Sequence, residues 1–201
     1  MKHLLAILFL FIVSISIAQT TGYKPGDKAI DFSLKNIDGK NVSLKNYNDA
    51  KGYIVVFTCN HCPYAKAYES RIEELNQKYA SKGYPVIAIN PNDPVAYPED
   101  SYENMQKNAA EKHFTFPYLL DETQNVAKTY GALKTPHVYI LKKVNNELIV
   151  KYVGAIDDNT ESAKDVKKKY AENALNELLQ DKTVKEPETK AIGCGIKWKK
   201  N

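Results

Sequence analysis

Runs of apolar residues divide the chain into short segments that predict an α/β fold. Residues 53–57 and 84–90 are almost continuously apolar, which is typical of strands buried on both faces of a sheet. Between them, apolar residues recur at helical spacing from about 63 to 80, and Gly83 follows the end of that pattern. A strand, a helix and a second apolar strand in this order predict a parallel βαβ unit with a right-handed crossover.

An antiparallel hairpin is predicted ahead of this unit. Residues 31–34 and 41–44 each alternate between apolar and polar side chains, and Asp38-Gly39 lies between them. Asp-Gly between two alternating runs is among the strongest short-range signals for a hairpin.

The loop at 91–100 is rich in proline, asparagine and aspartate and follows the carboxyl end of a buried strand, where α/β proteins often bind ligands. We expect it either to flank a functional site or to serve as a plain connection. After this loop, the pattern predicts a helix capped by Asp100 or Ser101 and ending near Lys112, and then a short extended piece at 114–120. A short helix from Thr123 to Tyr130 is closed by Gly131, and Thr135-Pro136 opens the next strand. That strand turns at Asn145-Asn146 into an antiparallel partner over 147–153, and a final amphipathic helix from about 163 to 179 buries Val166.

The first 18 residues predict a secretory signal. Lys2 opens it, an apolar stretch interrupted by two serines follows, and Ser16-Ile17-Ala18 is a small-x-small cleavage site. The alternative is a retained membrane anchor, but the apolar run is short for a span of roughly 20 residues. The expected organisation is a signal peptide at 1–18, one domain at 19–180 and a polar C-terminal tail at 181–201. This predicts a protein outside the cytosol, with no stable membrane association after cleavage.

Charge gives little sign of a polyanionic partner. The formal net charge is +4 at pH 7, and loss of Lys2 with the leader lowers it to +3. Every basic residue except Arg71 is a lysine. Because arginine supplies most specific contacts to base edges, this composition argues against nucleic-acid recognition.

The chemistry of the chain is concentrated in the segment FTCNHCPY (57–64), where two of the three cysteines lie between a buried strand and a helix. A thiolate at a helix N-terminus faces unpaired N–H groups and the positive end of the helix dipole, so its pKa falls and it becomes nucleophilic at neutral pH. A cysteine three residues away is placed to close or resolve a disulfide. Half of a zinc knuckle has the same C-x-x-C spacing, but the flanking strand and helix favour redox chemistry.

The element order and several motifs together resemble the thioredoxin fold, in its bacterial redoxin and peroxiredoxin-like (AhpC/TSA-like) branch. The resemblance covers about 26–180, and its motifs are FTCNHCPY, NPND followed by YPEDS, FPYLLDETQNVAKTYGA, TP and a terminal GCGIKWK. It implies an α/β protein with a mixed central sheet flanked by helices, an N-terminal β-hairpin and an inserted helix. Together with the signal pattern, the cysteine motif predicts a periplasmic or secreted bacterial enzyme. As an oxidoreductase it would need no cofactor, only a disulfide substrate, protein or small molecule, and an upstream redox partner.

By the same resemblance, Cys59 and Cys62 form the redox pair. Pro136 is then a cis-proline that faces their disulfide, and with Thr135 it offers backbone groups to an extended substrate. No metal is expected in this site.

The sequence leaves open which cysteine attacks. In thioredoxins several residues separate the strand from the first cysteine, whereas here only Thr58 separates Phe57 from Cys59. Counting from the strand, Cys62 takes the place at the helix start, where the dipole effect is strongest, and Pro63 suits the first helical position after it. The usual assignment in the thioredoxin family favours Cys59 instead.

Two further residues are candidates for supporting roles. His61 lies between the cysteines, where an imidazole would stabilise a thiolate and so destabilise a disulfide; the alternative is a solvated loop residue. Cys194 either resolves a mixed disulfide or a sulfenic acid on Cys62, or pairs with a partner protein, or is a free thiol in the tail. The sequence shows no buried acid beneath the pair that would serve proton transfer.

Three functions compete on this basis. The first is an extracytoplasmic thiol-disulfide oxidoreductase that works through Cys59 and Cys62. The second is a thiol peroxidase. Peroxiredoxins activate their cysteine with a nearby threonine and arginine. Thr58 does not have the usual spacing, and Arg71 lies on the following helix and is expected to point elsewhere, which weakens this hypothesis.

The third hypothesis is a copper-binding protein of thioredoxin-like fold. Copper chaperones of related fold bind through two cysteines and a distal histidine, and soft thiolates suit Cu(I). The remaining ligand here would be His61, His113 or Cys194. His137 is expected either to approach the site, because it follows Pro136, or to be an ordinary packing residue.

Overall fold

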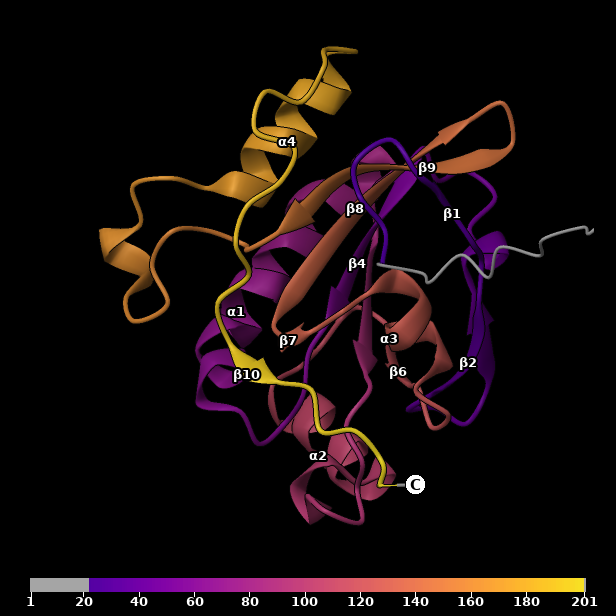
Figure 1. Ribbon diagram of the computed structural model, residues 1–201, viewed down its shortest axis with the longest axis vertical. Helices are drawn as coiled ribbons and strands as arrows, with labels where there is room; N and C mark the ends of the chain where they lie inside the picture. The colour runs from indigo at the N-terminus through magenta and orange to yellow at the C-terminus, as the bar shows by residue number, and fades with distance from the viewer. Residues whose placement is uncertain (1–21, 201) are drawn as a thin grey trace, which may run out of the picture.

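The computed structural model describes residues 22–200, and the predicted signal peptide at 1–18 lies outside this range. Within it, eight strands form one sheet in the order β1-β9-β8-β4-β5-β6-β2-β3, and β10 pairs with β7 in a separate two-stranded sheet (Figure 1). The strands are β1 (Lys28–Ala29), β2 (Ser33–Asn36), β3 (Asn41–Ser43), β4 (Gly52–Phe57), β5 (Val86–Asn90), β6 (Tyr118–Leu120), β7 (Lys134–Thr135), β8 (His137–Val144), β9 (Glu147–Gly154) and β10 (Cys194–Gly195). The helices are α1 (Pro63–Tyr79), α2 (Tyr102–Glu111), α3 (Asn125–Tyr130) and α4 (Tyr170–Leu179), with short 3-10 turns at Leu44–Asn46, Ala80–Lys82, Pro98–Asp100 and Ala163–Asp165.

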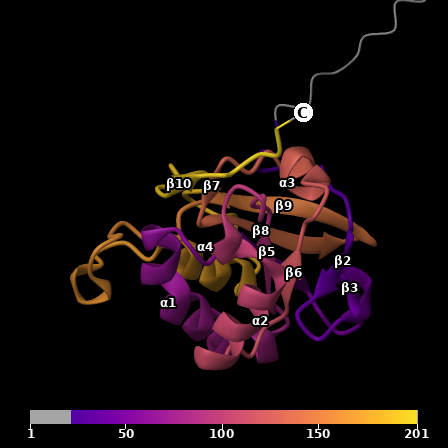
Figure 2. The ribbon, with the colours of Figure 1, turned by 90° about the horizontal axis from the view of Figure 1, so that it is seen from below.

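The predicted βαβ unit is confirmed and forms the centre of the fold. Strand β4 is buried at every position, since it pairs in parallel with β5 and antiparallel with β8. Alternate residues of β4 face opposite layers. Ile54 and Val56 join an apolar cluster with α1, α2 and α4, whereas Val55 and Phe57 join a second cluster with α3 and the hairpin. Figure 2 shows these helices on the two sides of the sheet, so the continuous apolar run reflects burial on both faces.

Both predicted hairpins are present. Strands β2 and β3 pair antiparallel across the Asp-Gly turn, and β8 and β9 pair antiparallel across Asn145 and Asn146. Both asparagines adopt positive φ, at 50° and 65°, a conformation that asparagine tolerates better than most residues. Ser101 caps α2 by accepting a hydrogen bond from the Asn104 amide, and Gly131 ends α3 in the left-handed region.

The predicted final helix is wrong in its first part. Helix α4 begins at Tyr170 rather than near residue 163, and Val166 lies in the extended segment before it. Asp158 explains the difference, because its carboxylate accepts the Lys167 amide and its own amide donates to the Lys168 carbonyl. These bonds hold the backbone outside the helical pattern, and the helix starts only after them.

The C-terminal tail returns from α4 across the molecule to the carboxyl edge of the sheet (Figure 1). Pro187 and Thr189 exchange backbone hydrogen bonds with Val153 of β9, and β10 then pairs with β7. The tail is therefore a docked segment of the domain. Within residues 22–200, no helix combines the length and apolar character needed to cross a membrane.

Candidate active site

Cys62 lies at the start of α1, as one of the two sequence hypotheses expects. It is the N-cap residue, with extended backbone angles (φ −68°, ψ 124°), and Pro63 follows at the first helical position. The side chain is fully buried. A sulfur in this place is next to the unpaired N–H groups of the first turn, which favour a thiolate.

The disulfide in the structure joins Cys62 to Cys194, with 6.1 Å between their Cα atoms. The expected Cys59–Cys62 disulfide is therefore wrong for this state of the protein, and so is the alternative of a free thiol in the tail. The tail explains the outcome, because strand β10 brings Cys194 against the helix start, whereas the Cys59 side chain faces the hydroxyl of Thr135.

Cys59 is free, and only 2% of it is exposed. Its sulfur lies 3.1 Å from Thr135 Oγ1. Burial raises the pKa of the Cys59 thiol to about 11, and the negative charge of Asp100 adds to the rise; hydrogen bonds from Thr135 and from the Cys62 amide offset it only in part. Cys59 is therefore protonated at neutral pH and is a weak nucleophile.

Thr135 meets all three cysteines. Its hydroxyl contacts Cys59, its carbonyl oxygen is 3.4 Å from the Cys62 sulfur, and its backbone pairs antiparallel with Cys194. It is fully buried, and the peptide bond from Thr135 to Pro136 is cis, as expected. Of the two residues proposed from sequence to bind substrate, Thr135 therefore lies directly against the cysteines, and Pro136 follows it in the chain.

A buried acid beside the motif escaped the sequence analysis. Asp100 has no exposed surface, and its carboxylate accepts the Asn60 amide at 2.6 Å and the Asn92 side-chain amide at 2.8 Å. His61 Nδ1 lies 2.5 Å from the same carboxylate, and its ring stacks on Tyr97 at 4.5 Å. His61 is therefore a fixed part of the site rather than a solvated loop residue. The loop at 91–100 flanks the site and supplies the acid.

A possible metal ligand set is formed by the same residues. Within the described chain, Cys59 Sγ, a ring nitrogen of His61 and a carboxylate oxygen of Asp100 lie within 4.8 Å of one another. A cation between them would compete with the His61–Asp100 hydrogen bond and would require the proton of Cys59 to leave. Of the other ligands considered for copper, His113 is exposed and Cys194 is bonded to Cys62.

His137 is a packing residue next to the site. It opens β8 directly after Pro136, is 9% exposed, and lies against the ring of Tyr139 at 4.8 Å between ring centres. Burial lowers the pKa of its imidazole to about 4, so the ring is neutral at physiological pH.

Arg71 is held away from the cysteines by an ion pair. Its Nη1 donates to both carboxylate oxygens of Asp157, at 2.9 Å and 2.8 Å, and to the Asn159 carbonyl. Both members of the pair are buried. The guanidinium is thus occupied on the α4 side of α1, in agreement with the expectation that it points elsewhere.

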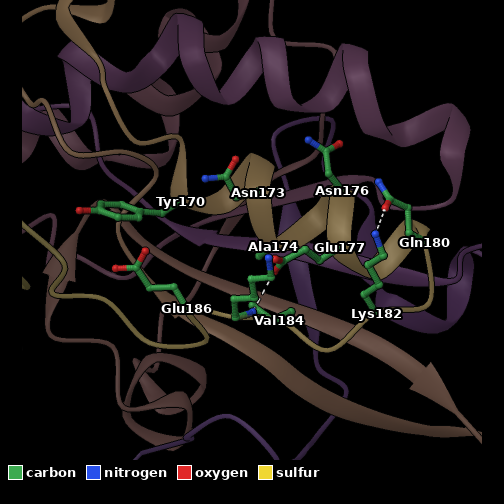
Figure 3. Close-up of a pocket in the computed structure, with 10 residues that line it drawn as sticks. Tyr170, Asn173, Ala174, Asn176, Glu177, Gln180, Lys182, Val184 and Glu186 are labelled. Atoms are coloured by element: carbon green, nitrogen blue, oxygen red, sulfur yellow. Dashed lines mark hydrogen bonds between the residues drawn. The ribbon is translucent and has the colours of Figure 1, made fainter.

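A separate pocket lies between α4 and residues 182–186 (Figure 3). Polar side chains line it, and two of its contacts are local: Lys182 Nζ donates to Gln180 at 2.7 Å and the Lys185 amide donates to Glu177 at 2.9 Å. In Figure 1, α4 lies near the top of the molecule and β10 in its lower half, and none of the residues that line this pocket belongs to the cysteine site.

A family model described as AhpC/TSA family matches residues 25–160, which is most of the domain. The chain belongs to the AhpC/TSA family. Its similarity to an uncharacterized conserved protein from Geobacillus kaustophilus extends over 88% of this chain and 93% of that one, with 40% identity and a TM-score of 0.81.

Curated relatives of this AhpC/TSA protein have redox names. The thioredoxin-like protein YneN of Bacillus subtilis is 31% identical over 125 residues, which are 61% of this chain and 68% of that protein. The thiol-disulfide oxidoreductase ResA of Halalkalibacterium halodurans is 23% identical over 135 residues, which are 67% and 72% of the two chains. With the three-cysteine site, these similarities identify the chain as a thiol redox enzyme of the thioredoxin fold.

Proposed function

We propose that this AhpC/TSA protein is a thiol-disulfide oxidoreductase in which Cys62 attacks the substrate and Cys194 resolves the intermediate. The observation that carries the proposal is the bond between Cys194 and a cysteine at the N-terminus of α1. The name of the relative ResA supports the same reaction class. The structure then corresponds to the oxidised enzyme after one turnover.

The reaction balances through two exchanges. The Cys62 thiolate attacks one sulfur of the substrate disulfide, forms a mixed disulfide and releases the other substrate sulfur as a thiolate. The Cys194 thiolate then attacks the Cys62 sulfur and releases the second substrate thiolate. Two electrons pass from the enzyme to the substrate, and an upstream dithiol partner returns the enzyme to its reduced form.

Cys59 has a secondary part in this scheme. It lies in one small cluster with Cys62 and Cys194, but the raised pKa of its thiol keeps it protonated during the first attack. We further propose that the enzyme works outside the cytosol, supported by the signal pattern at 1–18.

A thiol peroxidase is the second candidate. A distal tail cysteine bonded to a cysteine at a helix start is the arrangement that would resolve a sulfenic acid on Cys62. Against it, the buried Arg71 is committed to Asp157 and offers no positive charge to the thiolate.

The deciding experiment measures the fully reduced chain against insulin disulfides and against hydrogen peroxide. We expect efficient disulfide exchange, slow reaction with peroxide, and a Cys62–Cys194 bond in peptide maps of the product. Peroxide reaction orders of magnitude faster than that of a free thiol, with sulfenic acid trapped on Cys62, would replace the oxidoreductase with the peroxidase. A protein that reacts with neither reagent would exclude both the oxidoreductase and the peroxidase.

A further inference from the structure

The tail is bound to the site in the way that a second polypeptide would be. Strand β10 pairs antiparallel with β7, with Cys194 opposite Thr135 and Gly195 opposite Lys134, and the two strands lie side by side in Figure 2. The Ile196 amide extends this pairing by donating to the Leu133 carbonyl. The tail therefore combines an added strand with a disulfide to Cys62, as a trapped substrate chain would.

Resting on the proposed function, we propose that the tail is a built-in template of the enzyme's protein substrate. The substrate is an extended segment that replaces residues 193–199 along β7. Its cysteine takes the place of Cys194, a glycine precedes that cysteine, and a large apolar residue follows two positions later.

The position before the cysteine is restricted by backbone atoms. A Cβ added to Gly193 would lie 2.2 Å from the Thr135 carbonyl oxygen and 3.1 Å from the Pro136 nitrogen. No side-chain movement relieves such contacts, because both neighbours are main chain next to the buried cysteines. At Gly195, after the cysteine, an added Cβ would meet nothing within 4 Å. The two glycines flanking Cys194 thus differ, and only the first is required by the site.

The second position after the cysteine is an apolar anchor. Ile196 is 6% exposed and belongs to the cluster on the α3 side of the sheet. By contrast, Ile192 is 46% exposed although it lies in the same tail. A substrate segment therefore gains most from a large apolar residue at the place of Ile196.

The next position is held mainly by its backbone, and its side chain adds one cation–π contact, with Lys197 Nζ 4.8 Å from the centre of the Tyr97 ring. The Lys197 amide donates to Asn92 Oδ1 at 2.8 Å, and the Lys197 carbonyl accepts from the Asp93 amide at 2.9 Å and from Gln124 Nε2 at 2.8 Å. Such contacts are open to any side chain except proline. Selectivity is thus concentrated at the glycine and at the apolar anchor.

In this arrangement the tail and the substrate compete for the same edge of β7. Reduction of Cys62–Cys194 frees the tail and exposes the edge of β7, where the substrate segment binds. When Cys194 attacks Cys62 and the disulfide re-forms, the tail returns to β7 and displaces the reduced substrate.

The test uses the full chain with Cys59→Ser and Cys194→Ser, which leaves Cys62 as its only thiol. The probe is the peptide Gly-Cys-Gly-Ile-Lys-Trp, corresponding to residues 193–198, as a mixed disulfide with 5-thio-2-nitrobenzoate. Attack by Cys62 on the peptide sulfur releases the coloured thiolate, and mass spectrometry detects the protein–peptide disulfide. Valine in place of the first glycine, or aspartate in place of the isoleucine, should slow this step by about tenfold or more. Valine in place of the second glycine is the matched control and should change the rate by less than about twofold.

A second measurement removes the competing tail. Adding Ile196→Asp to the same variant should speed reaction with the parent peptide several-fold, whereas adding Ile192→Asp should not, with circular dichroism confirming that both are folded. Equal rates for all peptides, matching those of a small aromatic disulfide, would overturn the template while leaving the oxidoreductase intact. A Cys62 thiol that reacts with none of these disulfides would instead overturn the proposed function.

Discussion

Cys59 and Cys62 are three residues apart in the sequence, yet the fold gives them contrasting surroundings. Cys62 is the N-cap residue of α1, next to the unpaired N–H groups of the first turn, and is bonded to the tail. Cys59 lies before the helix, buried beside the Asp100 carboxylate, and the pKa of its thiol rises to about 11. Under the proposed function, the place of a cysteine relative to the helix start, rather than its place in the C-x-x-C pattern, decides which of the two attacks.

The largest expected effect comes from replacing each of the two cysteines in turn. We expect Cys62→Ser to lower the rate of disulfide exchange by about 1000-fold or more, because the nucleophile itself is lost. Cys59→Ser should cost less than about tenfold, because a protonated thiol takes no part in the first attack. Stopped-flow measurement with insulin or a small aromatic disulfide would check both. The reverse ranking would assign the attack to Cys59 and contradict the comparison.

The second prediction concerns alkaline stability. The folded-state pKa of Cys59 is raised from 9.0 to about 11, so its protonated thiol contributes fully to stability below pH 9.0. As the pH rises through that interval the unfolded chain loses the proton first, and the contribution of about 2 kcal/mol is lost. Urea titrations across this interval should show the wild type losing that much more free energy of unfolding than Cys59→Ser. Parallel curves for the two proteins would show that Cys59 titrates normally.

The smallest expected effect is that of the Asp100 charge on the pKa of the Cys59 thiol. Asp100→Asn removes the negative charge that adds to the burial effect, so the pKa of Cys59 should fall. Burial, the larger cause, remains and keeps it above the ordinary value. Alkylation of Cys59 by iodoacetamide should accelerate up to about tenfold. Asp93→Asn is the control, since this buried carboxylate in the same loop accepts the Val95 amide. Equal acceleration by both variants would point to loosening of the loop instead of charge.

Much of the fold was accessible from the sequence because local signals agreed with the tertiary arrangement. The buried run at 53–57, the Asp-Gly turn and the paired asparagines each specify one element almost unaided. The error at the start of α4 has a different origin. There, Asp158 binds the backbone of Lys167 and Lys168, a contact across the loop that no helical periodicity records.

The site was less accessible, because its decisive contacts join distant segments. Asp100 was identifiable only as a helix-cap candidate, since its approach to His61 depends on how the loop after β5 folds back. The partner of Cys62 was ambiguous because a tail strand has no signal until its pairing with β7 is known. The motifs identified the cysteines and Thr135-Pro136 as candidate site residues, but they did not determine which two cysteines form the disulfide.

In the terms of polymer physics, the Cys62–Cys194 bond converts an open chain into one that contains a large covalent ring. It closes a loop between residues 132 apart, which encloses most of the domain. A ring of this size has far fewer unfolded conformations than the open chain, which favours the folded oxidised protein by about 5 kcal/mol in chain entropy. Each turnover of the proposed reaction would therefore alternate a cross-linked chain with an open chain, and the enzyme is most stable in its oxidised form, before the redox partner reduces it.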